Sequence, residues 1–173
     1  MKSLPSGRQL ASLLVPFVVL VVIPAAILRL NPPPAGGWSE SAVTGAALSI
    51  LAAGVIVLGL GLLAATSLLF FRHGQGTIMP WDATRRLVVR GIYRHVRNPM
   101  HIGVFLALVG EGLLARAPSI LVFGAAFLVV HFAYIPLVEE RGLEARFGEA
   151  YRRYKRNVPR WIPRLKPWDP EMP

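Results

Sequence analysis

The sequence contains no cysteine and few acidic residues. Without a thiol, disulfide bonds, zinc–thiolate sites and cysteine nucleophiles are excluded. The sequence also lacks an HExxH motif, a glycine-rich phosphate loop behind a strand, and a Ser/His/Asp set in a suitable context. His73 and His95 have no metal-ligating neighbours along the chain, so we expect them to be loop residues and predict no metal site. These absences argue against zinc, P-loop and serine-hydrolase chemistry.

The abundant residues are apolar, and they are gathered into four long runs. Hydrophobic residues make up 54% of the 173 positions, and residues 10–28, 41–71, 99–115 and 119–138 are nearly free of charge. Runs of about 20 apolar residues can cross a bilayer as helices. The first run could instead be a signal peptide, but it is long for one and no small-residue cleavage site follows it. This favours a retained helix.

Small residues are concentrated in the second run. Gly45, Gly54, Gly59 and Gly61 lie among many alanines. In lipid, helices associate without a hydrophobic driving force, and small residues let their backbones approach closely. We therefore expect this run to contact a neighbouring helix through its glycines.

Basic residues are distributed unevenly among the connections. The chain has nineteen Lys and Arg, of which seventeen lie at the N-terminus, in residues 72–97 or after residue 140. Because basic loops stay in the cytosol, both termini and the 72–97 connection are predicted to be cytosolic. A net charge of +10 could also indicate nucleic acid. The basic residues flank hydrophobic runs, however, so we expect membrane lipids and no nucleic acid as partners.

These patterns predict an all-α integral membrane protein with about four transmembrane helices and a cytosolic amphipathic C-terminal helix. Leu143, Phe147, Tyr151 and Tyr154 recur at helical spacing and indicate that last helix over residues 139–155. The aromatic and basic tail suits either an interfacial anchor on anionic lipid or a cover over a cofactor. Residues 167–173 are predicted to be frayed. The chain forms a single membrane domain, with two spans in residues 1–71.

Asn98 and Pro99 are predicted to begin the third helix. Asn is a favoured N-cap residue, and Pro is a favoured first helical residue. The free N–H groups and the dipole at such a helix start favour an anion, so a ligand carboxylate or phosphate could bind there. A good helix start without a ligand is the alternative.

Ionisable residues lie within or next to the last two runs. Such groups are costly at membrane depth, which makes Glu111 and His131 functional candidates. His131, Ile135 and Glu139 follow at intervals of four, so an α-helix would place them on one face. Glu139 and Glu140 cannot face the same way, and we expect one to point into the bundle and the other to meet solvent or a loop arginine. The alternatives are a hydrogen-bonded bundle histidine and a solvated helix end.

Several of these residues belong to an ordered set of short motifs. The set comprises GIY at 91–93, VRNPMHIG at 96–103, EERGL at 139–143, FG at 147–148, Tyr151, Tyr154 and VPR at 158–160. This set resembles the isoprenylcysteine carboxyl methyltransferase family, in a wider group that includes phospholipid N-methyltransferases. The resemblance covers roughly residues 85–165, about half of the chain.

The resemblance implies a membrane-embedded methyltransferase that uses S-adenosylmethionine on a lipid-like, isoprenylcysteine-like or small-molecule acceptor. In the family the last two spans and the tail wrap the cofactor at the cytosolic face, so residues 72–173 would form the cofactor-binding region. The implied cofactor positions are Leu87, Val88, Tyr93, Asn98, Pro99, Met100, His101 and Glu139. For an acceptor that must lose a proton, Glu140 and His131 are the candidate catalytic bases.

Ile135 bears on the identity of the methyl acceptor. As we align the prenylcysteine branch of the family, it carries an arginine where this chain has Ile135. An apolar residue cannot hold an acceptor carboxylate as a guanidinium does, so we expect a small or lipid-like acceptor. A non-catalytic membrane protein of the same fold and a membrane reductase using NADPH are the alternatives. Compact size and the lack of an organelle-type signal favour a bacterial plasma membrane.

Overall fold

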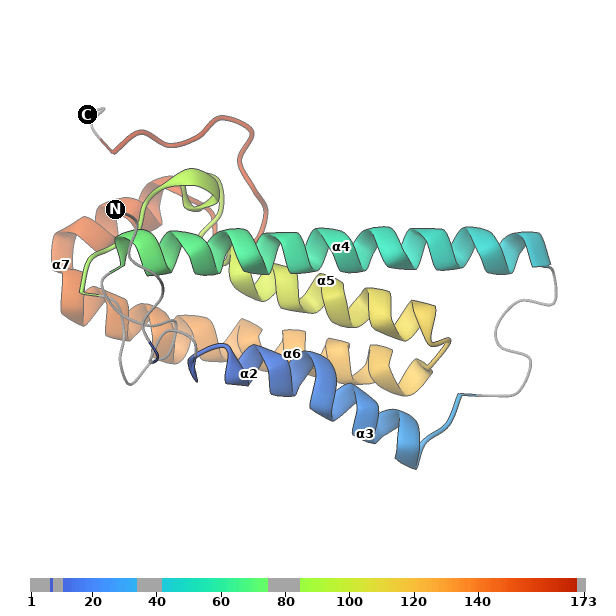
Figure 1. Cartoon of the computed structure of the whole chain (residues 1–173). Coiled ribbons are helices and arrows are strands. Elements are labelled where there is room, and N and C mark those ends of the chain that lie inside the picture. The colour runs from blue at the N-terminus through green and yellow to red at the C-terminus, as the bar shows by residue number, and fades with distance from the viewer. Residues whose placement is uncertain (1–6, 8–10, 34–41, 75–84, 171–173) are drawn as a thin grey trace.

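The computed structural model describes residues 7, 11–33, 42–74 and 85–170, and the regular elements within these residues are all helices. The first segment combines α2 (Leu14–Phe17), η1 (Val18–Val22) and α3 (Ile23–Leu30). It is followed by α4 (Ala42–His73), the short 3-10 helix η3 (Gly91–Arg94), α5 (Pro99–Leu114), α6 (Pro118–Tyr134), η4 (Ile135–Glu139) and α7 (Glu140–Asn157). Figure 1 shows the long segments side by side, with α7 at the end where α4 finishes and α5 begins. We call this end of the bundle the α7 end.

Two of the segments are long and apolar enough to cross a membrane, namely Val43–His73 and Pro118–Asn157. Only 11% and 17% of their most apolar windows are buried, so these helices present apolar side chains outward, unlike the core helices of soluble proteins. Leu14–Leu30 and Pro99–Leu114 are apolar but shorter. The predictions of an all-helical chain and of four apolar segments are confirmed. That all four segments cross the membrane stays a prediction.

Helices α4 and α5 pack backbone to backbone through glycine. A Cβ atom built on Gly59 would lie 2.6 Å from the carbonyl oxygen of Gly103, and one on Gly103 would lie 2.8 Å from that of Gly59. No side chain tolerates such distances, so the approach requires glycine at both positions. The predicted glycine contact is confirmed at Gly59. It is wrong for Gly54 and Gly61, where a Cβ would meet no atom within 4 Å in the described part of the chain.

Two π-helical turns interrupt the α-helical register, and each lies beside a proline. The N–H of Ile23 donates to the carbonyl of Val18 before Pro24, and the N–H of Glu140 donates to that of Ile135 across Pro136. Proline has no N–H, and its ring crowds the carbonyl four residues earlier, so regular α-helical bonding is interrupted near each proline.

The second π turn corrects a prediction about the acidic pair. Ile135 is 0% exposed and Glu140 is 2% exposed, whereas Glu139 is only partly buried. The interval of four predicts that Glu139 shares the buried face of Ile135. The π turn inserts one extra residue, so Glu140 lies on that face instead. The adjacent carboxylates also predict that one glutamate of the pair meets a loop arginine. This is confirmed for Glu140, which pairs with Arg97.

Helix α7 is kinked and is not the single continuous helix that the spacing predicts. Gly148 has φ 53° and ψ −127°, a backbone conformation open to glycine and strained for other residues. Beyond the kink, Tyr151 and Tyr154 are buried and form a cluster with Val158, against which Leu87 and Trp168 pack. A separate cluster around Val104, Ala107 and Leu108 lies in the bundle itself.

Candidate active site

The C-terminal tail lies along the segment that precedes α5. The N–H of Arg164 donates to the carbonyl of His95 over 3.0 Å, and the N–H of Trp168 donates to that of Arg94 over 2.9 Å. Arg94 also pairs with Asp169 at 3.4 Å. The prediction of a frayed tail is therefore wrong for Trp168 and Asp169, while residues 171–173 lie outside the described residues. His95 lies in a loop, as predicted, and it also holds the tail, because its Nδ1 lies 2.8 Å from the carbonyl oxygen of Arg164.

A buried carboxylate joins this tail to both α5 and α7. Glu140 accepts hydrogen bonds from Arg97 at 2.6 Å and from Arg160 at 2.7 and 2.9 Å, and Lys155 lies 3.6 Å away. The side chains of Glu140 and Arg97 are 3% and 8% exposed. Burial raises the pKa of Glu140, but the hydrogen bond from Arg160 and the charges of Arg97, Arg160 and Lys155 outweigh it and hold that pKa below its ordinary value. Glu140 is therefore charged at neutral pH and is a weak base.

The start of α5 leaves polar atoms without partners. Asn98 occupies the N-cap position and Pro99 the first helical position, as predicted. The Asn98 side chain caps no helical N–H, however, and its Nδ2 is buried without a partner among the described residues. The Nε of the neighbouring Arg97 is likewise buried without a partner among the described residues. Buried donors without acceptors are costly, and at a helix start they are suited to an anionic ligand.

Tyr93 is buried in the segment before α5 and contacts both α7 and α4. It is 6% exposed, its carbonyl accepts a hydrogen bond from the Tyr154 hydroxyl at 2.7 Å, and its ring meets that of Phe70 edge-on at 5.3 Å. Burial, the neighbouring Tyr154 and the charge of Glu139 raise the pKa of Tyr93 well above its ordinary value. The two members of the acidic pair therefore differ, since Glu140 lies in the ion cluster and Glu139 is only partly buried.

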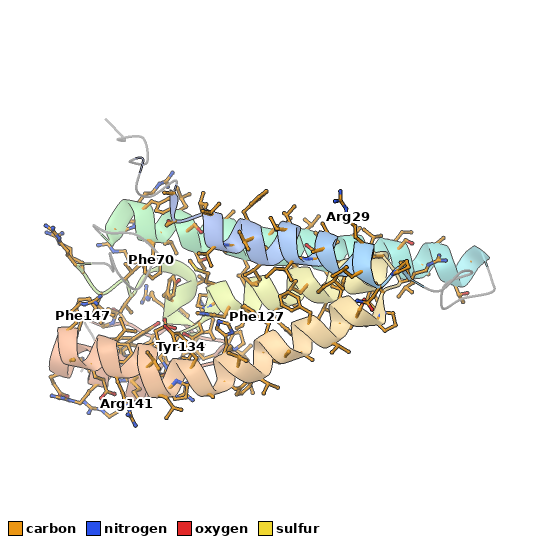
Figure 2. The ribbon with its side chains drawn as sticks, turned by 90° about the horizontal axis from the view of Figure 1, so that it is seen from below. Arg29, Phe70, Phe127, Tyr134, Arg141 and Phe147 are labelled. Atoms are coloured by element: carbon orange, nitrogen blue, oxygen red, sulfur yellow. The ribbon has the colours of Figure 1, made fainter. Side chains whose placement is uncertain are left out.

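His131 faces His101 across the interface of α6 and α5. Their ring centroids are 4.8 Å apart, and the His131 ring also lies 3.9 Å from that of Phe127, tilted by 30°, and 6.1 Å from that of Tyr134. Its Nδ1 lies 2.7 Å from the Phe127 carbonyl, which can only accept, so Nδ1 is the donor in this contact. Figure 2 shows the labelled Phe127 and Tyr134 extending toward the middle of the bundle, while Arg141 extends away from it.

The structure thus gathers most of the predicted site residues at the α7 end in two groups, whereas Glu111 lies in the last turn of α5, near the opposite end. In the first group Val88 and Pro99 are buried and Met100 is partly buried, while Leu87 packs on the cluster of Tyr154, whose hydroxyl binds Tyr93. His101 and His131 form the second group. Sequence reasoning missed the pairing of the two histidines, because no pattern in a single helix reports a contact between helices. It also missed Ser67 Oγ and Trp161 Nε1, which are buried and have no hydrogen-bond partner in the described part of the chain.

Comparison with known proteins identifies relatives of this arrangement. A sequence profile of the phospholipid methyltransferase family matches residues 49–150. A protein-S-isoprenylcysteine O-methyltransferase of Schizosaccharomyces pombe is 37% identical over 78 residues, which cover 44% of this chain and 33% of that protein. A methanethiol S-methyltransferase 2 of Bradyrhizobium diazoefficiens is 35% identical over 77 residues, which cover 43% of this chain and 27% of that protein. The matched part spans about a third or less of either relative.

The matched stretch extends from within α4 into α7 and contains most of the candidate site. It includes the start of α5, both histidines and the acidic pair, together with the apolar helices that carry them. It also covers more than half of the 173 residues. The chain therefore belongs to the phospholipid methyltransferase family of membrane proteins.

Proposed function

We propose that this protein is an S-adenosylmethionine-dependent methyltransferase whose cofactor binds at the α7 end of the bundle. The observation that carries the proposal is the buried Nδ2 of Asn98, which has no partner among the described residues and lies at the start of α5. This amide and the free N–H groups of the helix start are donors without an acceptor, and the carboxylate of the cofactor would supply one. Leu87, Val88, Tyr93, Pro99, Met100, His101 and Glu139 complete the proposed set.

The chemistry of these residues fits the rest of the cofactor. Glu139 is a carboxylate outside the ion cluster, and it suits the amine and ribose hydroxyls as an acceptor of hydrogen bonds. Tyr93, Leu87 and Val88 offer aromatic and apolar surface for adenine. When bound, the cofactor supplies a methyl group on a sulfonium, so the residues need mainly to orient the two reactants and exclude water.

The role of proton acceptor falls to His131 in this proposal. Because Nδ1 donates to the Phe127 carbonyl, Nε2 is the nitrogen that would take a proton from a thiol, hydroxyl or amine. Glu140, the other candidate base, is occupied by two guanidinium groups. We assign Glu140 a positioning role, in which it holds Arg97 beside Asn98 and ties the tail to α7.

The acceptor is proposed to be a small or lipid-like molecule. Ile135 is 0% exposed, and in our alignment it replaces the arginine that the prenylcysteine branch carries. A buried isoleucine can contact an apolar tail and cannot bind a carboxylate. The two relatives methylate oxygen and sulfur according to their names, so both chemistries are to be assayed.

We also propose that all four apolar segments cross a bacterial plasma membrane and that the α7 end is cytosolic. The described basic residues support this orientation, since Arg97, Arg160 and their neighbours lie at the α7 end, whereas Arg29 and Arg116 alone lie near the opposite end among the described residues.

Binding and turnover of radiolabelled cofactor test the proposal. Detergent-purified protein should bind S-adenosylmethionine and not NADPH, which would separate a methyltransferase from a membrane reductase. Methyl transfer to a panel of thiols and membrane lipids should exceed transfer to N-acetyl-farnesylcysteine. Binding without transfer to any acceptor would indicate a non-catalytic protein of this fold. Efficient methylation of the farnesylcysteine would contradict the argument from Ile135.

A further inference from the structure

The loop that follows α7 exposes two large apolar side chains. Ile162 is 80% exposed and Leu165 is 98% exposed, although the residues on either side of them make defined contacts. Arg164 donates through its backbone N–H to His95 over 3.0 Å and through Nη1 to the Asn157 carbonyl over 2.7 Å. Ile162 and Leu165 are therefore exposed although the loop that carries them is held in place.

A ring contact places this loop beside the apolar part of α6. Trp161 stacks on Phe132 with ring centroids 4.6 Å apart and an interplanar angle of 26°. Phe132 lies six residues before Val138, the end of the fourth apolar run, which corresponds to about 9 Å along a helix axis. If that run spans the membrane, the loop lies below the membrane surface. Figure 1 shows the chain after α7 turning back along the bundle to the level of the first turns of α5.

The charges of the loop complement a phospholipid leaflet. Arg164 and Lys166 lie among Trp161, Ile162 and Leu165 in residues 161–166. Long basic side chains can lay their stems along apolar surface and reach headgroup phosphates, while Trp prefers the interface and Ile and Leu the hydrocarbon. Pro163 and Pro167 stiffen the loop, so it presents these groups with little loss of freedom on binding.

We propose that residues 161–166 form a membrane-inserted loop, in which Ile162 and Leu165 enter the acyl region of the leaflet beside α6 while Arg164 and Lys166 remain at the phosphates. The occupant of this exposed apolar surface is phospholipid. The loop thereby fixes how deeply the α7 end lies in the membrane. This inference needs α6 to span the bilayer, and it is independent of the reaction that the protein catalyses.

The absence of cysteine makes a depth measurement direct, because a single introduced cysteine is the only labelling site. Spin labels would be attached to Ile162→Cys and Leu165→Cys, with Arg153→Cys on the exposed side of α7 as the matched control. The proteins would be reconstituted in vesicles of phosphatidylcholine and phosphatidylglycerol. Oxygen concentrates in hydrocarbon and a nickel chelate stays in water, so their collision rates with each label report its depth.

We expect the oxygen-to-nickel collision ratio to be several-fold higher at positions 162 and 165 than at position 153. Equal ratios at all three positions would overturn the proposal, because the loop would then lie in water. Low collision rates with both reagents would also overturn it, since protein and not lipid would cover the loop. Adding Trp161→Ala should lower the ratio at position 165 and leave position 153 unchanged. An unchanged ratio at position 165 would refute anchoring through Phe132.

Discussion

Arg160 donates hydrogen bonds to both carboxylate oxygens of Glu140, over 2.7 and 2.9 Å, and so closes the C-terminal tail onto the first turn of α7. The same carboxylate receives Arg97 from the segment before α5. One acidic side chain therefore connects three parts of the chain that meet at the candidate active site. The charge of Glu140 should be needed for the shape of the site rather than for proton transfer.

Glu140→Ala should destabilise the protein by about 3 kcal/mol, because it leaves the buried Arg97 without its counter-charge. We place the effect at the low end for a broken buried pair because Arg160 is 29% exposed and can regain water. Thermal unfolding in detergent measures the change. The control is Glu149→Ala, which removes ion pairs to Arg152 and Arg156 on the surface of α7 and should have little effect. Equal stability of the two variants would contradict the cluster's structural role.

Acidification should weaken the same cluster. The pKa of Glu140 is lower in the folded protein than in the unfolded chain, where a glutamate has a pKa of about 4.3. Its stabilising contribution is therefore complete above that value and is lost as the pH falls through the lower folded value. Unfolding temperatures measured from about pH 6 downward to about pH 3 should fall more steeply in the wild type than in Glu140→Gln. Parallel curves would show that another group governs acid stability.

Glu139→Ala should weaken S-adenosylmethionine binding by about 1–3 kcal/mol, the usual effect of losing a hydrogen bond to a charged group. Isothermal titration in detergent gives the affinity. Glu144→Ala is the matched control, because Glu144 is a glutamate of α7 that pairs with Lys155 at 2.7 Å and belongs to neither proposed group. If a folded Glu139→Ala protein bound the cofactor as the wild type does, Glu139 would have no part in the site.

His131→Ala should reduce turnover of a thiol or amine acceptor by about 10²–10⁴-fold, the range expected for a lost general base. Cofactor affinity should change little if His131 acts only on the acceptor. The pH profile provides the discriminating readout, because the wild-type fall in rate toward low pH, where a general base becomes protonated, should be missing in the variant. A carboxylate acceptor needs no base, so it should be affected much less. A variant that raised KM alone would assign His131 to binding.

Reporter fusions test the orientation. A fusion at Ala35, which lies outside the described residues, should report the non-cytosolic side, and a C-terminal fusion should report the cytosol. The expectation follows from the seventeen basic residues in the predicted cytosolic parts and the two in the other connections. Both fusions on one side of the membrane would contradict four spans.

The sequence by itself determined which stretches are helical and where the third helix begins. Apolar runs without charge have few alternatives to helices in lipid, because every backbone N–H and C=O must be satisfied within the chain. Pro99 begins α5 as predicted, since proline suits a first helical turn, and the structure confirms the fourth run up to its last residues. The motifs in residues 91–103 and 139–160 likewise sufficed to indicate the family, which the match over residues 49–150 confirms.

Only the tertiary structure decided how the site residues meet. A regular period of 3.6 residues places Glu139 on the face of Ile135, but the π turn around Pro136 moves Glu140 there. The contact of His101 with His131 and the docking of Trp168 on Arg94 join residues far apart in the chain. Periodicity reports only the faces of one regular helix at a time, so it reveals neither the contacts between helices, which follow from packing, nor the register shift beside Pro136.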